Sequence, residues 1–378
     1  MRKGWEYKKL GEVCALTMGQ SPDGNSINEV NGIEFHQGKT CFGERFLGIS
    51  PLYSNAPTKL AEAHSVLLCV RAPVGYPNIT DRKICIGRGL CALYAKREID
   101  NSFLYYSLLG KQSYFEKNAT GSTFKAISSK IVSNTTLSIP PLSTQLAIVS
   151  ELDKINELIR LKKEQLKDFD NLAQSLFYEM FGDPVENEKG WEVKKLKDIS
   201  REIGDGLHGT PEYSEVDTGC YFINGNNLEN GTIVIKENTK MVSEKTKTKH
   251  YIEMDDFTIL VSINGTLGKV AFYNGENVIL GKSACYIKLE AYNDKKYIFE
   301  LLKSDYFKRC AENECTGTTI RNVSLKSMRN FRCPLPPLPL QRLFAQRIEQ
   351  IEREKSEVQK SIQDLETLLA SRMQYWFE

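Results

Sequence analysis

One phrase of this 378-residue sequence occurs twice, and each copy opens a long helix-like stretch. The first copy reads Ile139-Pro-Pro-Leu-Ser-Thr-Gln145 and the second reads Leu335-Pro-Pro-Leu-Pro-Leu-Gln341, so the register between them is 336 − 140 = 196 residues. A repeat at so long a period is not a solenoid array. It indicates that one large unit, ending in a long helix, is present twice.

Apolar residues after both copies recur at alternating steps of four and three for about four heptads, the spacing of a coiled-coil seam. One such stripe is typical of an amphipathic core helix, but two stripes in the same register favour two long helices that pack on each other. Lys162 and Lys355 fall on these stripes, where a lysine either sets the register or extends to solvent. The predicted seam residues are Ile148, Leu152, Ile155, Ile159, Leu166 and Phe169 in the first helix and Phe344, Ile348, Ile351, Val358, Ile362, Leu365 and Leu369 in the second.

The sequence that precedes each helix is also duplicated. Gly4-Trp-Glu-Tyr-Lys-Lys-Leu10 recurs as Gly190-Trp-Glu-Val-Lys-Lys-Leu196 at an offset of 190 − 4 = 186, and Thr120-Gly-Ser-Thr123 recurs as Thr316-Gly-Thr-Thr319 at 316 − 120 = 196. β-rich runs, glycine turns and an aromatic helix-like stretch lie between these motifs in the same order in both halves. The predicted fold class is α+β, with two similar β-rich domains and two long helices. The predicted bounds are 1–139 and 184–335 for the domains and 140–183 and 336–378 for the helices.

The short connector after the first helix constrains the direction of the second. A helix from Thr144 to Phe181 has 38 residues and is about 57 Å long. The nine-residue connector Gly182–Gly190 reaches at most about 32 Å, so the second domain has to begin near the far end of the first helix. We therefore predict antiparallel helices with one domain at each end, related by a pseudo-twofold axis.

Charge and cysteine content narrow the class of protein. The formal net charge is +2, yet residues 1–139 carry 17 − 11 = +6, and a second basic cluster spans Lys245 to His250. This distribution is compatible with nucleic-acid binding. No apolar run is long enough to span a bilayer, and the N-terminus lacks the apolar region of a secretory signal. The ten cysteines form no CxxC pair, so we expect reduced thiols in a cytoplasmic protein without a metal site.

Two unlike domains held at a fixed distance have the geometry of a protein that reads two half-sites on a DNA duplex. The duplicated Pro-Pro-Leu-x-x-Gln, Gly-Trp-(x)3-Lys-Leu and Thr-Gly-Ser/Thr-Thr motifs resemble those of the specificity subunit of type I restriction–modification systems. The loops Gly19-Gln-Ser-Pro22 and Asp205-Gly-Leu-His-Gly-Thr-Pro211 are similar to loops of that family. The likeness covers essentially the whole chain.

The resemblance implies two target-recognition domains, each of which reads one half of a bipartite, asymmetric sequence in double-stranded DNA, while the helices set the spacing. It implies assembly with two modification (methyltransferase) subunits, and with restriction subunits in the full complex. This chain would be non-catalytic and without a cofactor; S-adenosylmethionine, ATP and Mg²⁺ would belong to the partner subunits of a DNA adenine methyltransferase and ATP-dependent endonuclease. Candidates for gripping the modification subunits are Glu151, Arg160, Lys163, Arg347, Glu354 and Lys360.

Candidate DNA contacts are polar and basic residues in the glycine loops and basic clusters, because such side chains bind phosphates or base edges. For each of them, solvated surface or loop capping is the alternative. In the first domain the candidates are Gln20, Ser21, Arg71, Arg82, Lys83, Arg88, Ser122, Thr123 and Lys125. In the second they are His208, Thr210, Asn224, Asn226, Asn264, Lys269, Lys282, Thr318, Thr319 and Arg321.

Two other functions compete with this interpretation: a duplicated coiled-coil adaptor that binds only proteins, and a single-chain nuclease. Gly275–Ser283 resembles a phosphate-binding loop but has five residues between its glycines where the motif has four. Asp183, Glu192 and Lys194 loosely fit a nuclease metal site but straddle a linker. His208 has no second metal ligand at a helical spacing. A binding subunit without chemistry of its own is therefore the preferred interpretation.

Overall fold

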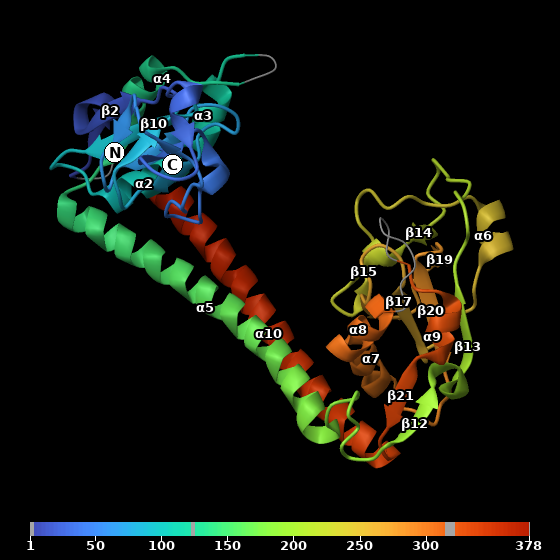
Figure 1. Cartoon of the computed structure of the whole chain (residues 1–378). Coiled ribbons are helices and arrows are strands. Elements are labelled where there is room, and N and C mark those ends of the chain that lie inside the picture. Colours follow the sequence, from blue (N-terminus) through green and yellow to red (C-terminus); the bar gives the residue numbers. More distant parts are fainter. Residues whose placement is uncertain (1–3, 122–124, 314–321, 378) are drawn as a thin grey trace. The chain divides into compact units, whose positions relative to one another are not determined.

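The computed structural model describes residues 4–121, 125–313 and 322–377 of the chain (Figure 1). It divides into two compact units, Met1–Glu164 with Gln359–Glu378, and Gln165–Val358. Each unit contains one β-rich domain together with part of α5 (Leu142–Phe181) and part of α10 (Leu338–Phe377). None of the helices in the described ranges combines the length and apolar character that a bilayer crossing requires.

The first unit is built on an antiparallel four-stranded sheet in the order β2-β10-β7-β8. Alternate residues of β7 face opposite sides of this sheet, so Val66 and Leu68 pack with α2, whereas Leu67 and Cys69 pack with β9. Helices therefore cover one face, and a five-stranded sheet of short strands in the order β3-β5-β4-β9-β6, in which β4 and β9 are parallel, covers the other. The elements are β1 (Glu6–Lys9), α1 (Leu10–Val13), β2 (Cys14–Met18), η1 (Gly24–Ser26), β3 (Ile27–Asn28), β4 (Ile33–His36), η2 (Lys39–Cys41), β5 (Tyr53–Ser54), β6 (Leu60–Ala61), β7 (Val66–Cys69), β8 (Pro77–Ile79), β9 (Ile84–Ile86), β10 (Leu90–Ala95), α2 (Asn101–Leu109), α3 (Gln112–Asn118), α4 (Ser129–Asn134) and β11 (Thr136–Ile139).

The second unit repeats this plan with the antiparallel sheet β13-β20-β17-β18. Ile259 and Val261 of β17 pack with α7, whereas Leu260 packs with β19 on the other face. Strands β14 and β19 form the parallel pair that corresponds to β4 and β9. The elements are β12 (Glu192–Lys195), η3 (Leu196–Ile199), β13 (Ser200–Asp205), β14 (Tyr221–Ile223), η4 (Gly225–Asn227), β15 (Leu228–Glu229), β16 (Thr232–Ile233), α6 (Glu244–His250), β17 (Thr258–Ser262), β18 (Val270–Phe272), β19 (Val278–Leu280), β20 (Ala284–Leu289), α7 (Lys295–Lys303), α8 (Asp305–Asn313), α9 (Leu325–Asn330) and β21 (Arg332–Leu335). The prediction of two similar α+β domains is confirmed.

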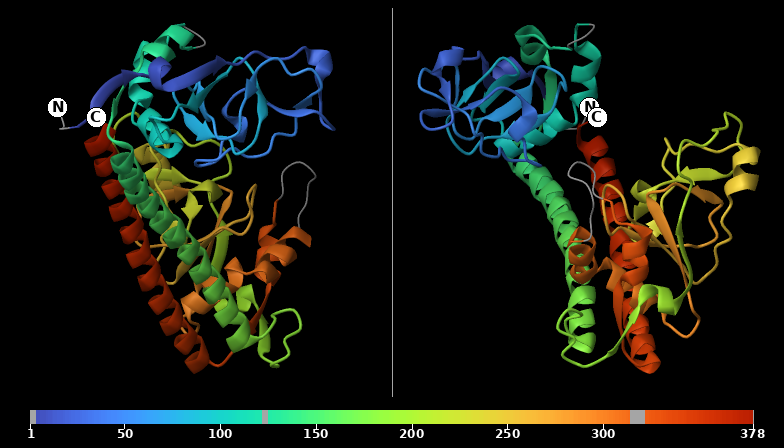
Figure 2. Two further views of the ribbon diagram at one scale, coloured as in Figure 1. Left: turned by 90° about the vertical axis from the view of Figure 1, so that its left-hand side faces the viewer. Right: turned by 45° about the vertical axis from the view of Figure 1, so that its right-hand side comes forward.

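The contacts between α5 and α10 within each unit are those of antiparallel helices, as predicted. In the first unit, the guanidinium Nη2 of Arg372, near the end of α10, donates to Glu151 Oε2, near the start of α5, at 3.0 Å. In the second unit, Lys355 Nζ donates to Asp170 Oδ1 at 2.9 Å. Two further views show both helices as continuous ribbons (Figure 2).

Both Pro-Pro-Leu-x-x-Gln phrases end in a buried glutamine that joins its helix to its domain. The Gln145 side-chain oxygen accepts a hydrogen bond from the Asp100 N–H (2.9 Å), and its amide donates to the Pro140 carbonyl (2.9 Å). Gln341 accepts from the Asp294 N–H (3.0 Å) and donates to the first proline of its own phrase (2.8 Å). Asp100 and Asp294 cap α2 and α7. The repeated phrase is therefore a repeated joint between a long helix and a domain helix.

The structure buries most of the predicted seam and leaves part of it half-exposed. Lys355 lies on the seam but forms ion pairs with Asp170 and Glu352, while Lys162 is half-buried. The unit boundaries fall inside α5 and α10, whereas the sequence predicts the helices as separate segments at 140–183 and 336–378. The buried seam residues are Ile148, Leu152, Ile155, Ile159, Phe344, Ile348, Ile351, Val358 and Ile362, and the half-buried ones are Leu166, Phe169, Leu365 and Leu369.

Candidate nucleic-acid interface

Four loops of the first unit meet where strands β2, β4, β7 and β9 end. The Gly19 N–H donates to the Leu90 carbonyl (2.9 Å), the Gly89 N–H to the Gln37 carbonyl (3.1 Å) and the Val70 N–H to the Gly89 carbonyl (2.9 Å). These bonds bring together segments that are far apart in the sequence. We call segments 19–20, 37–38, 70–71 and 87–89 the first loop cluster.

Glycine is required where these loops cross. A Cβ on Gly19 would lie 2.1 Å from the Gly87 carbonyl oxygen, and a Cβ on Gly89 would lie 2.2 Å from the Gln37 carbonyl oxygen. Real Cβ atoms do not approach backbone oxygens so closely. The close crossing fixes the neighbouring positions in space, and the exposed side chains that they carry are Gln20, Gln37, Arg71 and Arg88.

The second unit contains a matching arrangement, which we call the second loop cluster (206–208, 224–225, 263–264 and 281–283). The Leu207 N–H donates to the Leu280 carbonyl (2.7 Å) and the Lys282 N–H to the Leu207 carbonyl (3.1 Å). A Cβ on Gly206 would lie 2.0 Å from the Leu280 carbonyl oxygen, so glycine is required here too.

Shared backbone bonds identify equivalent positions in the two clusters. The Gly87 N–H donates to the His36 carbonyl and the Gly281 N–H to the Ile223 carbonyl, each at 2.8 Å. The acceptor residue, His36 or Ile223, is followed in each unit by a residue with an amide side chain. The donor glycine is followed in each unit by a cationic residue. The Val70 and Ile263 carbonyls likewise accept from a later segment at 2.9 Å in each unit. The equivalent pairs are Gln37 and Asn224, Arg71 and Asn264, and Arg88 and Lys282.

The predicted DNA contacts fall into several groups. Gln20, Arg71 and Arg88 lie in the first loop cluster, and the Lys125 carbonyl accepts from the Ala72 N–H beside it (3.0 Å). His208, Asn224, Asn264 and Lys282 belong to the second loop cluster. The other described candidates lie outside both clusters: Ser21, Arg82, Lys83, Thr210, Asn226 and Lys269. Ser122, Thr123, Thr318, Thr319 and Arg321 lie outside the described residues.

Some of these candidates already have partners inside the protein. His208 Nε2 lies 2.8 Å from Asp205 Oδ2, and Lys83 Nζ lies 2.7 Å from Glu62 Oε1. Lys269 Nζ is 3.8 Å from a carboxylate oxygen of Glu229. All three side chains keep solvent access, so these pairs are weak and leave the side chains accessible to a DNA phosphate.

The structure disfavours two of the predicted DNA contacts, Arg82 and Ser21. The Arg82 guanidinium donates to both carboxylate oxygens of Glu34 (2.6 and 2.7 Å) and to the Gly48 carbonyl (2.9 Å). These bonds use Arg82 to hold β4 and the loop that follows it, which favours a structural role over a DNA contact. The Ser21 hydroxyl oxygen is shielded from solvent and has no hydrogen-bond partner among the described residues, so it is not placed to reach DNA.

Replacing Arg82 by alanine is expected to raise the pKa of Glu34. Burial of Glu34 opposes its ionisation, but hydrogen bonds from Arg82, the Ser50 N–H and His36 outweigh this effect and lower its pKa to about 2. Ionised Glu34 therefore stabilises the fold above its ordinary pKa of about 4.3, and this contribution is lost as the pH falls toward 2. In Arg82→Ala, a carboxyl titration followed by NMR should show Glu34 protonating at or above about pH 4.

Lys83→Ala is the matched control, because Lys83 pairs with the exposed Glu62 at 2.7 Å and does not contact Glu34. It should leave the Glu34 titration unchanged. A Glu34 pKa that stays near 2 in Arg82→Ala would show that the guanidinium is not what holds the carboxylate ionised.

Sequence reasoning missed Gln37, although the sequence carries a signal for it. Phe35-His-Gln-Gly38 aligns with Phe222-Ile-Asn-Gly225 at an offset of 222 − 35 = 187, close to the offset of the preceding motif. Both stretches read Phe-x-amide-Gly. Of Gln37 and Asn224, only Asn224 is among the predicted DNA contacts. The match between the two stretches becomes clear when the parallel strand pair β4–β9 is compared with β14–β19.

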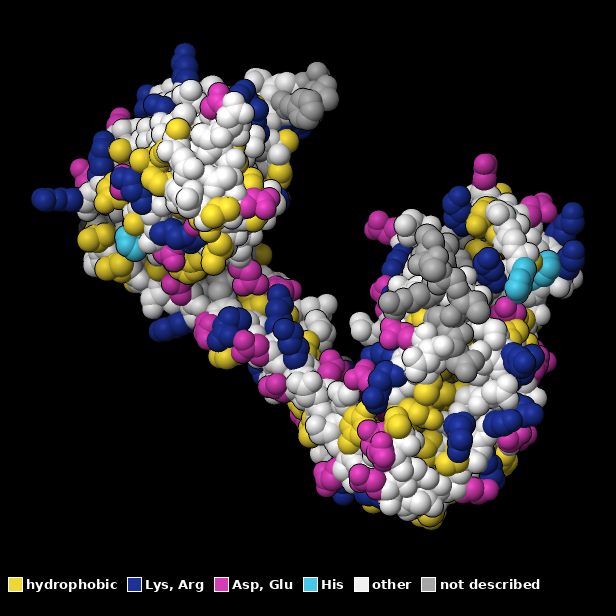
Figure 3. Space-filling view, viewed as in Figure 1, with side chains coloured by type: hydrophobic (Ala, Val, Ile, Leu, Met, Phe, Trp, Pro, Cys, Tyr) yellow, Lys and Arg dark blue, Asp and Glu magenta, His cyan; other side chains and the backbone are white. Residues whose placement is uncertain are grey.

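Helix α6 adds a basic surface to the second unit. Its sequence Glu-Lys-Thr-Lys-Thr-Lys-His contains three lysines and one histidine, and lysine side chains gather around it in the space-filling view (Figure 3). The Ser243 N–H, at its start, donates to the Glu212 carbonyl (2.9 Å), which ties α6 to the loop that follows the second loop cluster. No helix occupies this position among the described elements of the first unit.

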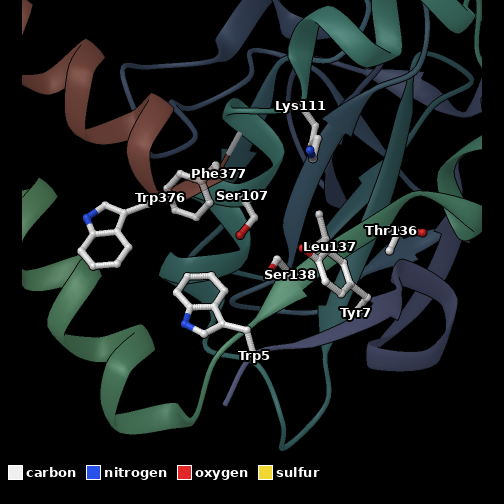
Figure 4. Close-up of a pocket in the computed structure, with 9 residues that line it drawn as sticks. All are labelled: Trp5, Tyr7, Ser107, Lys111, Thr136, Leu137, Ser138, Trp376 and Phe377. Carbon is white, nitrogen blue, oxygen red and sulfur yellow. The ribbon is translucent and has the colours of Figure 1, made fainter. Parts of the chain in front are cut away.

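A pocket of about 140 Å³ lies in the first unit, where β1, β11 and the end of α10 meet (Figure 4). The indole rings of Trp5 and Trp376 are nearly parallel there, with centroids 6.2 Å apart. Lys111 is the one charged side chain among the described residues that line the pocket. Among the described residues, no group of three or more His, Cys, Asp or Glu side chains is arranged to hold a metal ion.

Comparison with known proteins gives a consistent match for both halves of the chain. The family model described as type I restriction modification DNA specificity domain matches residues 2–168 and again residues 188–367. A putative type I restriction enzyme specificity subunit, MjaX, of Methanocaldococcus jannaschii is 36% identical over 176 residues, which are 46% of this chain and 41% of that protein. The MjaVIII specificity subunit of the same organism is 21% identical over 97% of this chain and 92% of its own length.

Solved structures of similar fold come from the same systems. One solved structure, from work on the assembly and conformational transition of the type I restriction–modification system, has a TM-score of 0.68 at 19% identity. The match covers 100% of this chain and 98% of that chain. The specificity subunit from M. genitalium has a TM-score of 0.53 at 16% identity, covering 99% of this chain and 96% of its own. At these identities the likeness concerns the fold alone.

Proposed function

Because this chain belongs to the type I restriction–modification DNA specificity family, we propose that its two domains read the two halves of a bipartite, asymmetric DNA target. The proposal rests on one observation above all. The two loop clusters share their backbone hydrogen bonds and their glycine crossings but do not carry the same side chains, since Arg71 of the first cluster occupies the position that Asn264 holds in the second. The same frame with different polar groups fits two readers of different base sequences.

Helices α5 and α10 would then act as the spacer between the half-sites. Each has 40 residues and is about 60 Å long as a straight helix. The glutamine joints at Gln145 and Gln341 fix each helix to a domain by buried hydrogen bonds, which supports a spacing that is set by the fold rather than by a flexible linker.

The partner subunits would dock on these helices. In the second unit, a groove is lined by the apolar residues Phe169, Leu172, Leu176 and Ile351 together with Arg347, Gln350 and Glu354. Leu172 is 50% exposed, which supports an apolar contact with a protein partner. Its equivalent at 172 + 196 is Leu368, which is 46% exposed in the first unit. An apolar position that recurs in both units fits two copies of one partner, the modification (methyltransferase) subunit.

Three of the six charged residues predicted to grip that partner form ion pairs within the helices. Arg160 pairs with Glu157 and Glu164, and Lys163 pairs with Glu366. Glu151 pairs with Arg372. Only Arg347 and Glu354 of that set line the groove, so apolar contacts rather than these charges would supply most of the docking energy.

The chain is a specificity subunit and therefore a non-catalytic component. Catalysis would reside in the modification and restriction subunits of a cytoplasmic complex, which would bind S-adenosylmethionine, ATP and Mg²⁺.

Exchange of residues 1–139 for the corresponding domain of another specificity subunit tests the proposal. The complex of the hybrid chain with its methyltransferase subunits should methylate a target in which one half-site is new and the other is unchanged. Single-molecule sequencing of methylated bases in cells that carry either chain measures this directly. A change in both half-sites, or in neither, would refute independent reading by the two domains.

A further inference from the structure

We infer that Gln37 is a specificity-determining residue whose side-chain amide reads an adenine in the half-site of the first domain, with Asn224 in the equivalent role in the second. The inference rests on the proposed function, since it names the side chains through which the two domains would read bases. It starts from the geometry of the two loop clusters.

Gln37 is held in place by rigid backbone on both sides. It directly follows β4, whose last residue His36 pairs with Ile86 of the parallel strand β9. The Gly87 N–H donates to the His36 carbonyl (2.8 Å) and the Gly89 N–H to the Gln37 carbonyl (3.1 Å). Base reading requires a reader positioned by a stable scaffold, and these bonds fix the Gln37 backbone on the sheet.

The side chain of Gln37 is free to bind a ligand. It is exposed, and its amide has no hydrogen-bond partner within the described part of the chain. A Cβ on Gly87 would lie 3.2 Å from Gln37 Cγ and 3.0 Å from Gln37 Cα. Gly87 therefore leaves room for the Gln37 side chain against the turn between β9 and β10, which also carries Arg88.

The second unit places the same chemistry at the same point. Asn224 follows β14, and the Gly281 N–H donates to the carbonyl of the preceding residue, Ile223 (2.8 Å). A Cβ on Gly281 would lie 2.2 Å from Asn224 Oδ1, so here too an amide lies against a glycine that precedes a cation, Lys282. The Ser283 hydroxyl donates to Asn224 Oδ1 (3.0 Å) and orients the amide.

An amide beside a cation is suited to a base edge and the adjacent phosphate. A carboxamide offers a donor and an acceptor side by side, which match N7 and N6 of adenine in the major groove. A neighbouring arginine or lysine neutralises a phosphate and fixes the register of the protein on the duplex. Among the described residues, no hydrogen bond engages the Gln37 amide, and the Asn224 amide is engaged through its oxygen, so the Gln37 amide and the Asn224 amide nitrogen remain available to a base.

The test uses the full chain and a pool of DNA duplexes with randomised positions, from which bound sequences are recovered and sequenced. The wild-type chain should select two short motifs at a fixed separation. Gln37→Ala should flatten one position of one motif and reduce the preference for adenine there by on the order of tenfold. Asn224→Ala should do the same in the other motif. Gln37→Glu should shift the position from adenine toward cytosine, because a carboxylate accepts from the cytosine N4 amino group.

Gln363→Ala is the matched control: it removes the same side chain from an exposed position of α10, and both motifs should be unchanged. Two motifs that remain as in the wild type in Gln37→Ala and Gln37→Glu would overturn the inference about Gln37 while leaving the proposed function intact. A wild-type chain that selects no motif would instead overturn the proposed function. Because Gln37 is exposed, both variants should keep the wild-type melting temperature, which separates a loss of reading from a loss of folding.

Discussion

Binding of the full chain to a duplex with both half-sites is expected to weaken about a thousandfold or more as salt rises from about 50 to 200 mM. Each phosphate that a lysine or arginine neutralises releases counterions, and the logarithm of the binding constant falls by about 0.9 per phosphate for each tenfold rise in salt. Arg71, Arg88 and Lys125 in the first unit are exposed, as is Lys282 in the second. About three phosphate contacts in each domain are enough to give a loss of this size.

The contribution of a single lysine or arginine to the salt dependence of DNA binding can be measured separately. Arg88→Ala should reduce the salt dependence by about one phosphate, because Arg88 directly follows Gly87 at the glycine crossing of the first loop cluster. Lys167→Ala, on the exposed face of α5, is the control and should leave the slope unchanged. Fluorescence anisotropy of a labelled duplex over a salt series gives both slopes. A shallow slope for the wild-type chain would favour the alternative of an adaptor that binds proteins and no DNA.

The long helices and their direction could be predicted because they follow from local periodicity and chain reach. A heptad stripe needs no knowledge of the rest of the fold, and the nine residues of the Gly182–Gly190 connector limit where the next domain begins. The structure nevertheless buries Ile148 and Ile362 and leaves Leu166 and Leu365 half-exposed. Which seam residues are fully covered depends on how each helix half packs against its domain, and that packing is not encoded in a heptad.

The role of the repeated glutamine could not be predicted from the sequence, for a different reason. Gln145 and Gln341 bond to backbone groups at Asp100 and Asp294, which are 45 and 47 residues away. A contact over that separation leaves no periodic trace in the sequence. The repetition of the phrase showed that the position is constrained, and only the structure shows that the constraint is a buried hydrogen-bonded joint.

Candidate DNA contacts were the least predictable part, because residue type does not reveal what a side chain already binds. Arg82 and Arg88 are six positions apart and look alike in the sequence. Arg82 is held by Glu34 and Gly48, whereas Arg88 is exposed beside the glycine crossing. Gln37 shows the opposite error, because an amide that does not stand out in the sequence belongs to the first loop cluster.

Replacing Phe344 by alanine is expected to lower the free energy of unfolding of the second unit by about 3–5 kcal/mol. Phe344 is fully buried, and its ring packs edge-on against Phe177 and Phe181 of α5, with centroids 5.8 and 5.1 Å away. Both of those rings also pack against Tyr297 of α7. Removal of the ring therefore opens a cavity where α5, α10 and the second domain meet, and rigid neighbours on three sides cannot close it.

Leu343→Ala is the control for this substitution, since Leu343 is the adjacent residue of α10 and is 42% exposed. Its loss should change the unfolding free energy by less than about 1 kcal/mol. Trp191 is the one tryptophan of the second unit, so urea unfolding followed by its fluorescence, with Trp5 and Trp376 replaced by phenylalanine, reports on that unit. Equal midpoints for Phe344→Ala and Leu343→Ala would mean that the helix pair and the second domain do not share a core. In that case the fold could not hold the second recognition domain at a fixed position on the helical spacer. A protein that reads a split target with one spacing needs such a fixed position.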